Sequence, residues 1–202
     1  DGIPFPAGRK VVEAPDGTLF VLGREKVARR PASPVPGKPE FEPVAPAGLS
    51  DLVGDVMDIV LAPDGSLVLA GLRGAARLEG DRLTRIELGP AHVVKPESAD
   101  YVWAAVFDAG GALWVARTFG ITRVGPDGGL RTMPLDWEHQ VNSGWGWLPS
   151  MTVDRSGRVW LLTVGQGAWR LGEGSDGDPF QRQRASRCRR HQFHQGKEIP
   201  AG

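Results

Sequence analysis

Four segments of the sequence share one pattern, in which a turn glycine is followed at fixed distances by an apolar pair and a basic residue. The turn glycines lie 48, 46 and 46 residues apart and are Gly17, Gly65, Gly111 and Gly157. The apolar pair lies two and four residues after each glycine, as Leu113 and Val115 do after Gly111. Alternating apolar residues are typical of a half-buried strand, because successive strand side chains point to opposite faces. The pattern therefore predicts one short-stranded unit that occurs four times.

The composition favours strands over helices in these units. The 202 residues include 28 glycines and 17 prolines, which are the poorest helix formers. Units of about 40 to 50 residues with several short strands are typical of β-propeller blades. We therefore predict an all-β fold of about four four-stranded antiparallel blades, which either close on themselves or form a segment of a larger propeller. The blades are expected over residues 9–46, 47–90, 91–135 and 136–172, with the basic segment 173–202 lacking stable structure because it has little apolar content.

The third unit shows the clearest strand pattern. Its expected strands are Val102–Phe107, Ala112–Arg117, Ile121–Val124 and Leu130–Met133. The turn between the first two has the form Asp-x-x-Gly, in which glycine adopts the positive φ that a tight hairpin needs. The aromatic residue of the second strand, Trp114 here and Trp160 in the fourth unit, is expected to pack between blades because large rings bury the most area.

The connections between units are expected to lie on one rim of the propeller together with the bends after the second strands. The turns between first and second strands then lie on the opposite rim. Residues 30–46 contain six prolines, so we expect that connection to be extended without regular pairing.

The third and fourth units, residues 108–124 and 154–171, carry the pattern Asp-x-x-Gly-x-[Leu/Val]-Trp-[Val/Leu] followed by a glycine bend and a basic residue. This pattern resembles the two-component regulator propeller repeat, which builds extracytoplasmic sensor domains of hybrid histidine kinases and of propeller-linked diguanylate cyclases. The first two units depart from it, with Phe20 and Val68 in place of the tryptophan. The resemblance implies a non-enzymatic periplasmic or extracytoplasmic sensor domain, or a segment of one. Its signalling output domain or partner protein would lie outside this sequence.

Charge and cysteine content exclude several other classes. The 24 basic residues balance 24 acidic ones, which excludes a strong general attraction to nucleic acid or to an anionic membrane. No apolar run approaches the roughly 18 residues of a membrane span. One cysteine, Cys188, can form neither an intrachain disulfide nor a cysteine metal site, and the four histidines lack metal-ligand spacing. We expect no metal and no cofactor.

The richest candidate for ligand binding is the connection before the fourth unit. Tryptophans, a histidine and the single asparagine of the chain are interleaved there; the candidates are Trp137, His139, Asn142, Trp145 and Trp147. Aromatic faces beside hydrogen-bonding groups suit a small polar ligand such as a carbohydrate, although Trp145 and Trp147 could equally fill the core. Arg73 and Arg117 recur near the bends before the third strands and could recognise a carboxylate or phosphate, or pair with neighbouring acidic groups.

Two other functions stay open at this point. A propeller can act as a protein-interaction scaffold, and an incomplete one can associate into oligomers because its blade faces are exposed. The blade rhythm also resembles metal-dependent lyases and lactonases. Their axial metal is held by Glu, Asn and Asp from separate blades, and the single asparagine, Asn142, weakens that interpretation.

Overall fold

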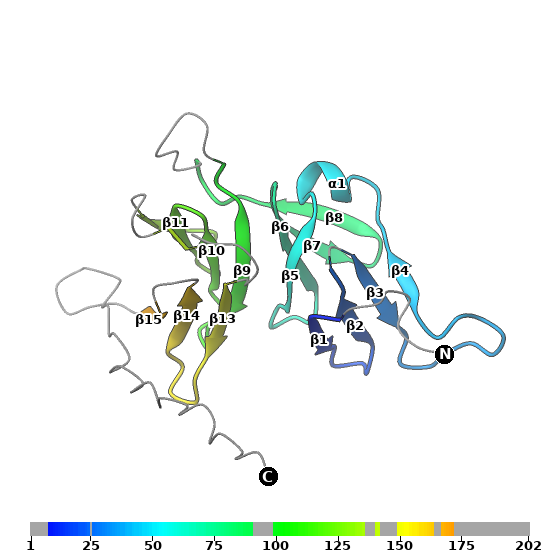
Figure 1. The fold of residues 1–202 in the computed structure, drawn as a ribbon. Coiled ribbons are helices and arrows are strands. Elements are labelled where there is room, and N and C mark those ends of the chain that lie inside the picture. The colour runs from blue at the N-terminus through cyan, green and yellow to red at the C-terminus, as the bar shows by residue number, and fades with distance from the viewer. Residues whose placement is uncertain are drawn as a thin grey trace, which may run out of the picture.

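The computed structural model describes residues 8–24, 26–90, 99–135, 140–141, 149–163 and 167–171. Their strands form four antiparallel sheets, each built from consecutive strands (Figure 1). The first sheet contains β1 (Lys10–Glu13), β2 (Leu19–Leu22), β3 (Val27–Arg30) and β4 (Glu42–Val44). The second contains β5 (Val56–Leu61), β6 (Leu67–Gly71), β7 (Gly74–Glu79) and β8 (Arg82–Ile86). The third contains β9 (Val102–Phe107), β10 (Leu113–Arg117), β11 (Gly120–Val124) and β12 (Leu130–Pro134), and the fourth contains β13 (Ser150–Val153), β14 (Val159–Thr163) and β15 (Gly167–Leu171).

The four sheets are arranged as propeller blades, which confirms the predicted fold class. Within each sheet the strands follow chain order from one edge to the other, and the first strands of consecutive sheets, β1, β5, β9 and β13, contact one another. Three hydrophobic clusters fill the spaces between the first and second, second and third, and third and fourth sheets. Burial between consecutive sheets therefore holds the blades together.

The outer faces of the first and fourth sheets carry exposed apolar residues. Val12 packs against the cluster shared with the second sheet, so its neighbour Val11 points to the other face, where it is 59% exposed. By the same alternation Leu161 is buried in the cluster between the third and fourth sheets, while Leu162 is 54% exposed. In the part of the chain that the structure describes, no hydrophobic cluster joins the fourth sheet to the first.

The four turn glycines have the backbone conformation that the repeat predicted. Gly17, Gly65, Gly111 and Gly157 have φ between 75° and 87°. Each donates its N–H to the carbonyl three residues earlier, as Gly111 does to Asp108 at 3.0 Å. A residue with a Cβ would be strained at this φ, which explains why glycine recurs there.

Strand boundaries in the third sheet agree with the prediction to within one residue, but the proline-rich connection differs. Residues 42–44 within it form β4, which pairs with β3 in the register Val27↔Val44 and Ala28↔Pro43. The expectation of no regular pairing over residues 30–46 was therefore wrong. Proline is compatible with this position because β4 is the edge strand, where a missing N–H need not break a ladder. A second element absent from the prediction is the single-turn helix α1 (Leu49–Leu52), which precedes β5.

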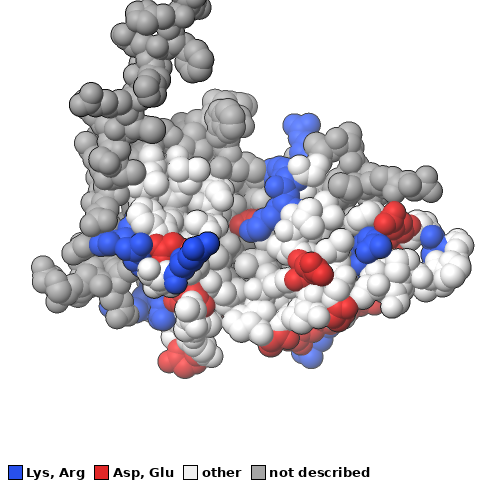
Figure 2. All heavy atoms as spheres, turned by 90° about the horizontal axis from the view of Figure 1, so that it is seen from below, with Lys and Arg blue, Asp and Glu red and all other residues white. Residues whose placement is uncertain are grey.

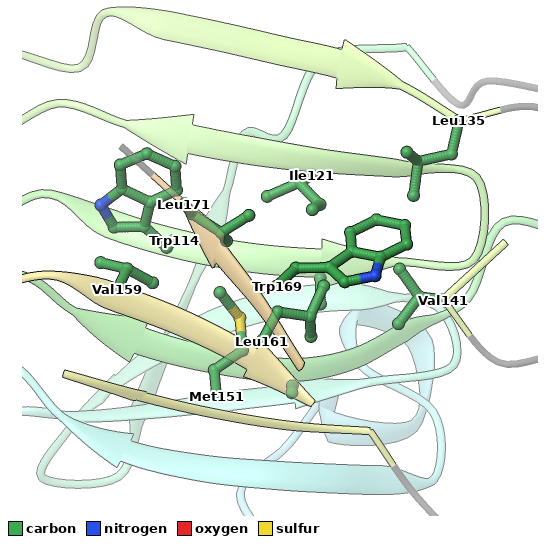
Figure 3. Close-up of a cluster of buried hydrophobic side chains, with 11 residues drawn as sticks. Trp114, Ile121, Leu135, Val141, Met151, Val159, Leu161, Trp169 and Leu171 are labelled. Atoms are coloured by element: carbon green, nitrogen blue, oxygen red, sulfur yellow. The ribbon is translucent and has the colours of Figure 1, made fainter. Parts of the chain in front are cut away.

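The aromatic residues of the second strands occupy equivalent positions but different surroundings. Trp114 is 4% exposed and lies in the cluster between the third and fourth sheets, as predicted. Figure 3 shows its ring in one cluster with Ile121, Leu171 and the indole of Trp169. Trp160 projects from the face of β14 opposite to that cluster and is half-buried.

Candidate functional site

The tryptophan and aspartate of the repeat are joined by a hydrogen bond. Trp114 donates its Nε1–H to Oδ2 of Asp108 at 2.8 Å, and Oδ1 of Asp108 accepts the backbone N–H groups of Gly110 and Ala112, each at 2.9 Å. Trp160 and Asp154 form the same bond, also at 2.8 Å. The spacing of six residues between aspartate and tryptophan therefore serves to anchor the indole to the turn.

The first two sheets lack both members of this pair. Ala14 and Ala62 stand where the third sheet has Asp108, and Phe20 and Val68 stand where it has Trp114. Their turn aspartates, Asp16 and Asp64, lie two positions later and accept N–H groups from Thr18 and Ser66 within the turn itself. This difference is visible in the sequence, because the turn aspartate lies one residue before the turn glycine in the first two units and three residues before it in the last two. The shared turn glycine alone does not distinguish the two kinds of turn.

The recurring basic residue of the third strand lies directly across from the second-strand aromatic. Trp114 pairs with Arg123 in the ladder, and the Arg123 guanidinium lies 5.8 Å from the centre of the indole and 3.7 Å from Asp108. Phe20 is opposite Arg29 in the same way. In the third sheet the aspartate, tryptophan and arginine of the repeat thus form a structural unit, and the binding chemistry must be sought elsewhere.

The buried carboxylate of Asp58 links the first strands of the first three sheets, β1, β5 and β9. Oδ1 of Asp58, on β5, accepts a hydrogen bond from Nζ of Lys10 on β1 at 2.8 Å. Its Oδ2 accepts one from the backbone N–H of Ala105 on β9 at 2.9 Å. Oδ1 also accepts the N–H of Ile59 at 2.9 Å. This role could not be predicted from the repeat, because the equivalent position holds lysine, alanine and serine in the other sheets. Since both oxygens are engaged, Asp58 stabilises the assembly of the sheets.

Two predicted candidates, Arg73 and Arg117, line one cavity of about 220 Å³ between the second and third sheets. We call it the linker-rim cavity; its lining residues are 72–74, 85–89, 100, 102 and 117. It lies where the connection between the two sheets meets the bends after β6 and β10. The structure thus brings the two arginines together on the predicted rim.

Arg117 forms the inner wall of the linker-rim cavity. Its side chain is 6% exposed, its Nη2 lies 2.7 Å from Oδ2 of Asp100, and its Nη1 donates to the carbonyl of Leu88 at 2.9 Å. The Asp100 side chain is 1% exposed, and its Oδ1 accepts the N–H of Phe119 at 3.1 Å. Arg117 is therefore held as the alternative interpretation predicted, in a buried ion pair.

Arg73 and Arg85 lie exposed at the mouth of the linker-rim cavity. Neither side chain has an ion-pair or hydrogen-bond partner among the residues that the structure describes. Arg85, on the outer strand β8, was not among the predicted candidates. Three guanidinium groups here outnumber the carboxylates of Glu87 and Asp100, so the cavity carries a net positive charge.

The other five predicted residues, Trp137, His139, Asn142, Trp145 and Trp147, lie outside the described residues. Within their segment, Val141 is buried in the cluster between the third and fourth sheets and donates its N–H to the carbonyl of Thr118 at 2.9 Å. The described part of this connection therefore contacts the bend after β10, at the rim that holds the linker-rim cavity. The role of the five residues stays a prediction.

The face that the turns occupy carries both acidic and basic residues (Figure 2). Figure 2 shows this face, with acidic and basic residues interspersed among neutral ones. Within the described ranges, no group of three His, Cys, Asp or Glu residues is placed to hold a metal ion. Over the same ranges, no helix has the length and apolar character to cross a membrane.

No family model and no curated protein sequence matches this chain, whereas several solved structures are similar to it. One is the extracellular domain of the hybrid two-component system BT4673 from B. thetaiotaomicron, with a TM-score of 0.63 and 14% identity over 90% of this chain and 23% of that one. Another is a catalytically inactive virginiamycin B lyase from Staphylococcus aureus with quinupristin, with a TM-score of 0.60 and 16% identity over 87% of this chain and 56% of that one. A third is an auxiliary nutrient binding protein from Bacteroides ovatus, with a TM-score of 0.55 and 11% identity over 83% and 39% of the two chains.

These likenesses show the fold alone, because the identities are low. The chain spans between 23% and 56% of the length of these three proteins. Its propeller fold is shared by extracellular sensor domains and by lyases, which have different functions.

Proposed function

We propose that this chain is part of an extracytoplasmic, ligand-sensing β-propeller that binds a small polar anion at the linker-rim cavity. The observation that carries the proposal is the pair of exposed guanidinium groups, Arg73 and Arg85, which have no ion-pair partner among the described residues and lie at the mouth of one cavity. Guanidinium groups bind carboxylates and phosphates through two parallel hydrogen bonds. A sugar that carries such a group is the ligand class that best fits both the arginines and the aromatic segment 137–147.

The size of the linker-rim cavity limits what it can hold. At about 220 Å³ it is smaller than the roughly 300 to 1,000 Å³ of sites that enclose a drug-sized ligand. It accommodates a carboxylate or phosphate group, with the remainder of the ligand outside the cavity. Arg117 stiffens the wall through Asp100 and so preorganises the site without losing its own partner.

The propeller class is supported by the likeness to the BT4673 extracellular domain and by the resemblance of residues 108–124 to the regulator propeller repeat. In this role the protein transmits ligand occupancy to an output domain or partner, and it is not itself an enzyme. The lyase alternative rests on the likeness to virginiamycin B lyase, and no cluster of described residues favours it over the sensor.

The test compares glucuronate with glucose and inorganic phosphate by isothermal titration calorimetry on the full chain. We expect glucuronate and phosphate to bind and glucose to bind at least tenfold more weakly. Arg73→Gln combined with Arg85→Gln removes both free guanidinium groups, and we expect anion affinity to fall at least tenfold. Arg82→Gln is the matched control, because Arg82 is an exposed arginine of the same strand that does not line the cavity. Equal anion binding by the double variant and the control would show that the anion site is elsewhere.

A further inference from the structure

A second cavity, of about 580 Å³, opens on the opposite rim between the first and second sheets. We call it the turn-rim cavity; the residues that define it are Ala14, Asp16, Phe20, Asp64, Leu78 and Glu79. It lies against the β1–β2 and β5–β6 turns and the end of β7. It shares no residue with the linker-rim cavity, so it is independent of the proposed function.

The turn-rim cavity lies where the tryptophan–aspartate pair is missing. In the third sheet the indole of Trp114, bonded to Asp108, is buried against the fourth sheet beside the turn. At the equivalent positions the first sheet has Phe20 and Ala14, which are smaller and which both line the cavity. The substitution of both residues thus leaves open a space that a side-chain pair fills in the third sheet.

The base of the turn-rim cavity is apolar. Phe20 and Leu78 come from facing sheets and belong to, or pack against, the cluster between them. Phe20 is half-buried, so part of its ring is available to a ligand. An apolar base with an accessible aromatic ring suits a hydrocarbon body rather than a bare ion.

The edge of the turn-rim cavity is acidic. Asp16, Asp64 and Glu79 line it, against one guanidinium, Arg29, which lies 3.5 Å from Glu42. Asp64 contacts Arg77, whereas neither Asp16 nor Glu79 has a cationic partner among the residues described. Hydrogen bonds from the backbone and hydroxyl of Thr18 hold the pKa of Asp16 below its usual value, so this carboxylate stays ionised.

We infer that the turn-rim cavity binds a small organic cation, with its ammonium group at Asp16 and Glu79 and its apolar body on Phe20. The two carboxylates supply the charge that no cation among the described residues offsets, and the Phe20 ring packs against the hydrocarbon body. A neutral molecule of the same shape gains only the apolar contact, and an anion is repelled. The site therefore discriminates by charge among ligands with the same body.

The experiment uses three probes with one hydrocarbon body: phenethylamine, phenethyl alcohol and 3-phenylpropionate. Saturation-transfer NMR and calorimetry on the full chain measure their binding. We expect phenethylamine to bind at least fivefold more tightly than the alcohol, and the carboxylate not to bind. No binding of phenethylamine at its solubility limit, or equal binding of amine and alcohol, would overturn the inference.

Two sets of variants locate the site. Asp16→Asn with Glu79→Gln keeps the turn acceptor but removes both charges, and we expect the amine to bind no more tightly than the alcohol. Asp127→Asn is the matched control, because Asp127 is an exposed turn carboxylate of the third sheet that accepts a similar backbone N–H. The affinity of this variant for phenethylamine should not change. Ala14→Asp with Phe20→Trp restores the pair of the third sheet and should abolish binding while circular dichroism stays native. Amine binding that survives both double variants places the cation elsewhere and refutes the assignment.

Discussion

The hydrogen bond between Trp114 and Asp108 gives the sharpest test of how the blades are held. Asp108 accepts three N–H groups at 2.8 to 2.9 Å, one of them from an indole that is 4% exposed. A hydrogen bond to a charged group contributes about 1.5 to 3 kcal/mol, and an unsatisfied buried donor costs about 1 to 3 kcal/mol. Asp108→Ala should therefore lower the free energy of unfolding by about 3 kcal/mol.

The partner substitution and the double variant isolate the bond itself. Trp114→Phe loses ring volume in the cluster as well as the bond, and should cost about 2.5 kcal/mol. Asp108→Ala together with Trp114→Phe reproduces the alanine and phenylalanine of the first sheet, and no indole N–H is then left without an acceptor. We expect the double variant to lower the free energy of unfolding by about 4 kcal/mol. This is about 1.5 kcal/mol less than the sum of the two single effects, and the difference is the coupling energy between the two side chains.

Urea denaturation followed by circular dichroism measures these four proteins. The control is Asp16→Ala, because among the described residues Asp16 accepts hydrogen bonds only from Thr18 of its own turn. It should lower the free energy of unfolding less than Asp108→Ala does, because the Asp16 carboxylate is exposed to solvent. If the Asp108 and Trp114 effects simply add to within about 0.5 kcal/mol, the indole–carboxylate bond does not stabilise the blade and the reasoning fails.

Three further predictions concern other contacts. Asp58→Ala leaves the N–H of Ala105 without its acceptor and should lower the free energy of unfolding, measured by urea denaturation, by about 3 kcal/mol. Lys10→Ala should lower it by under about 1 kcal/mol, because the lysine side chain is 34% exposed. Equal effects of the two substitutions would contradict the inter-sheet role of Asp58. Arg117→Ala leaves the Asp100 carboxylate buried without its guanidinium and should lower the free energy of unfolding by about 3 to 5 kcal/mol. The double variant Arg117→Met with Asp100→Leu should recover part of this loss, because neither charge then remains buried. No recovery would show that the unpaired buried carboxylate is not the cause of the loss. The bond from Trp160, with further donors from residues 156 and 158, holds the pKa of Asp154 far below its usual 3.8. Because the folded-state pKa is depressed, this stabilisation is present above the unfolded value and lost only as pH falls through the folded one. The Trp160 indole N–H resonance should therefore stay constant as the pH falls through 3.8, where an unperturbed aspartate titrates, and should shift only well below that value. A shift centred near pH 3.8 would contradict the bond.

Much of the fold could be predicted from the sequence because each sheet is a local hairpin series. Glycine with positive φ fixes the turns, and alternation fixes which residues face a neighbouring sheet. The short strand β4 could not be found in this way, because its three residues include Pro43 and lie in a connection dominated by proline. Its pairing depends on where β3 ends and on the edge position, which are tertiary facts.

The candidate site was predicted in part for the same reason. Arg73 and Arg117 occupy similar places in consecutive units, so the repeat geometry brings them to one rim. Arg85 comes to the same cavity through the pairing of β7 with β8, in the register Ala75↔Ile86, which the charge pattern of β8 does not reveal. Sequence repetition predicts contacts between equivalent positions better than contacts between different ones.

The turn-rim cavity arises where the repeats differ rather than where they agree. Between the third and fourth sheets the indole of Trp114 and its carboxylate fill the space beside the turn, and the interface is closed. Between the first and second sheets Phe20 and Ala14 leave that space open, and carboxylates shifted by two positions line its edge. The third blade, which keeps the tryptophan and aspartate, is thus stabilised at that interface, while the first blade, which has neither, has a cavity beside its turn and no orphaned polar group among the described residues. Loss of the pair does not by itself open such a cavity, because the second sheet has also lost it and its Val68 is fully buried in the cluster shared with the third sheet.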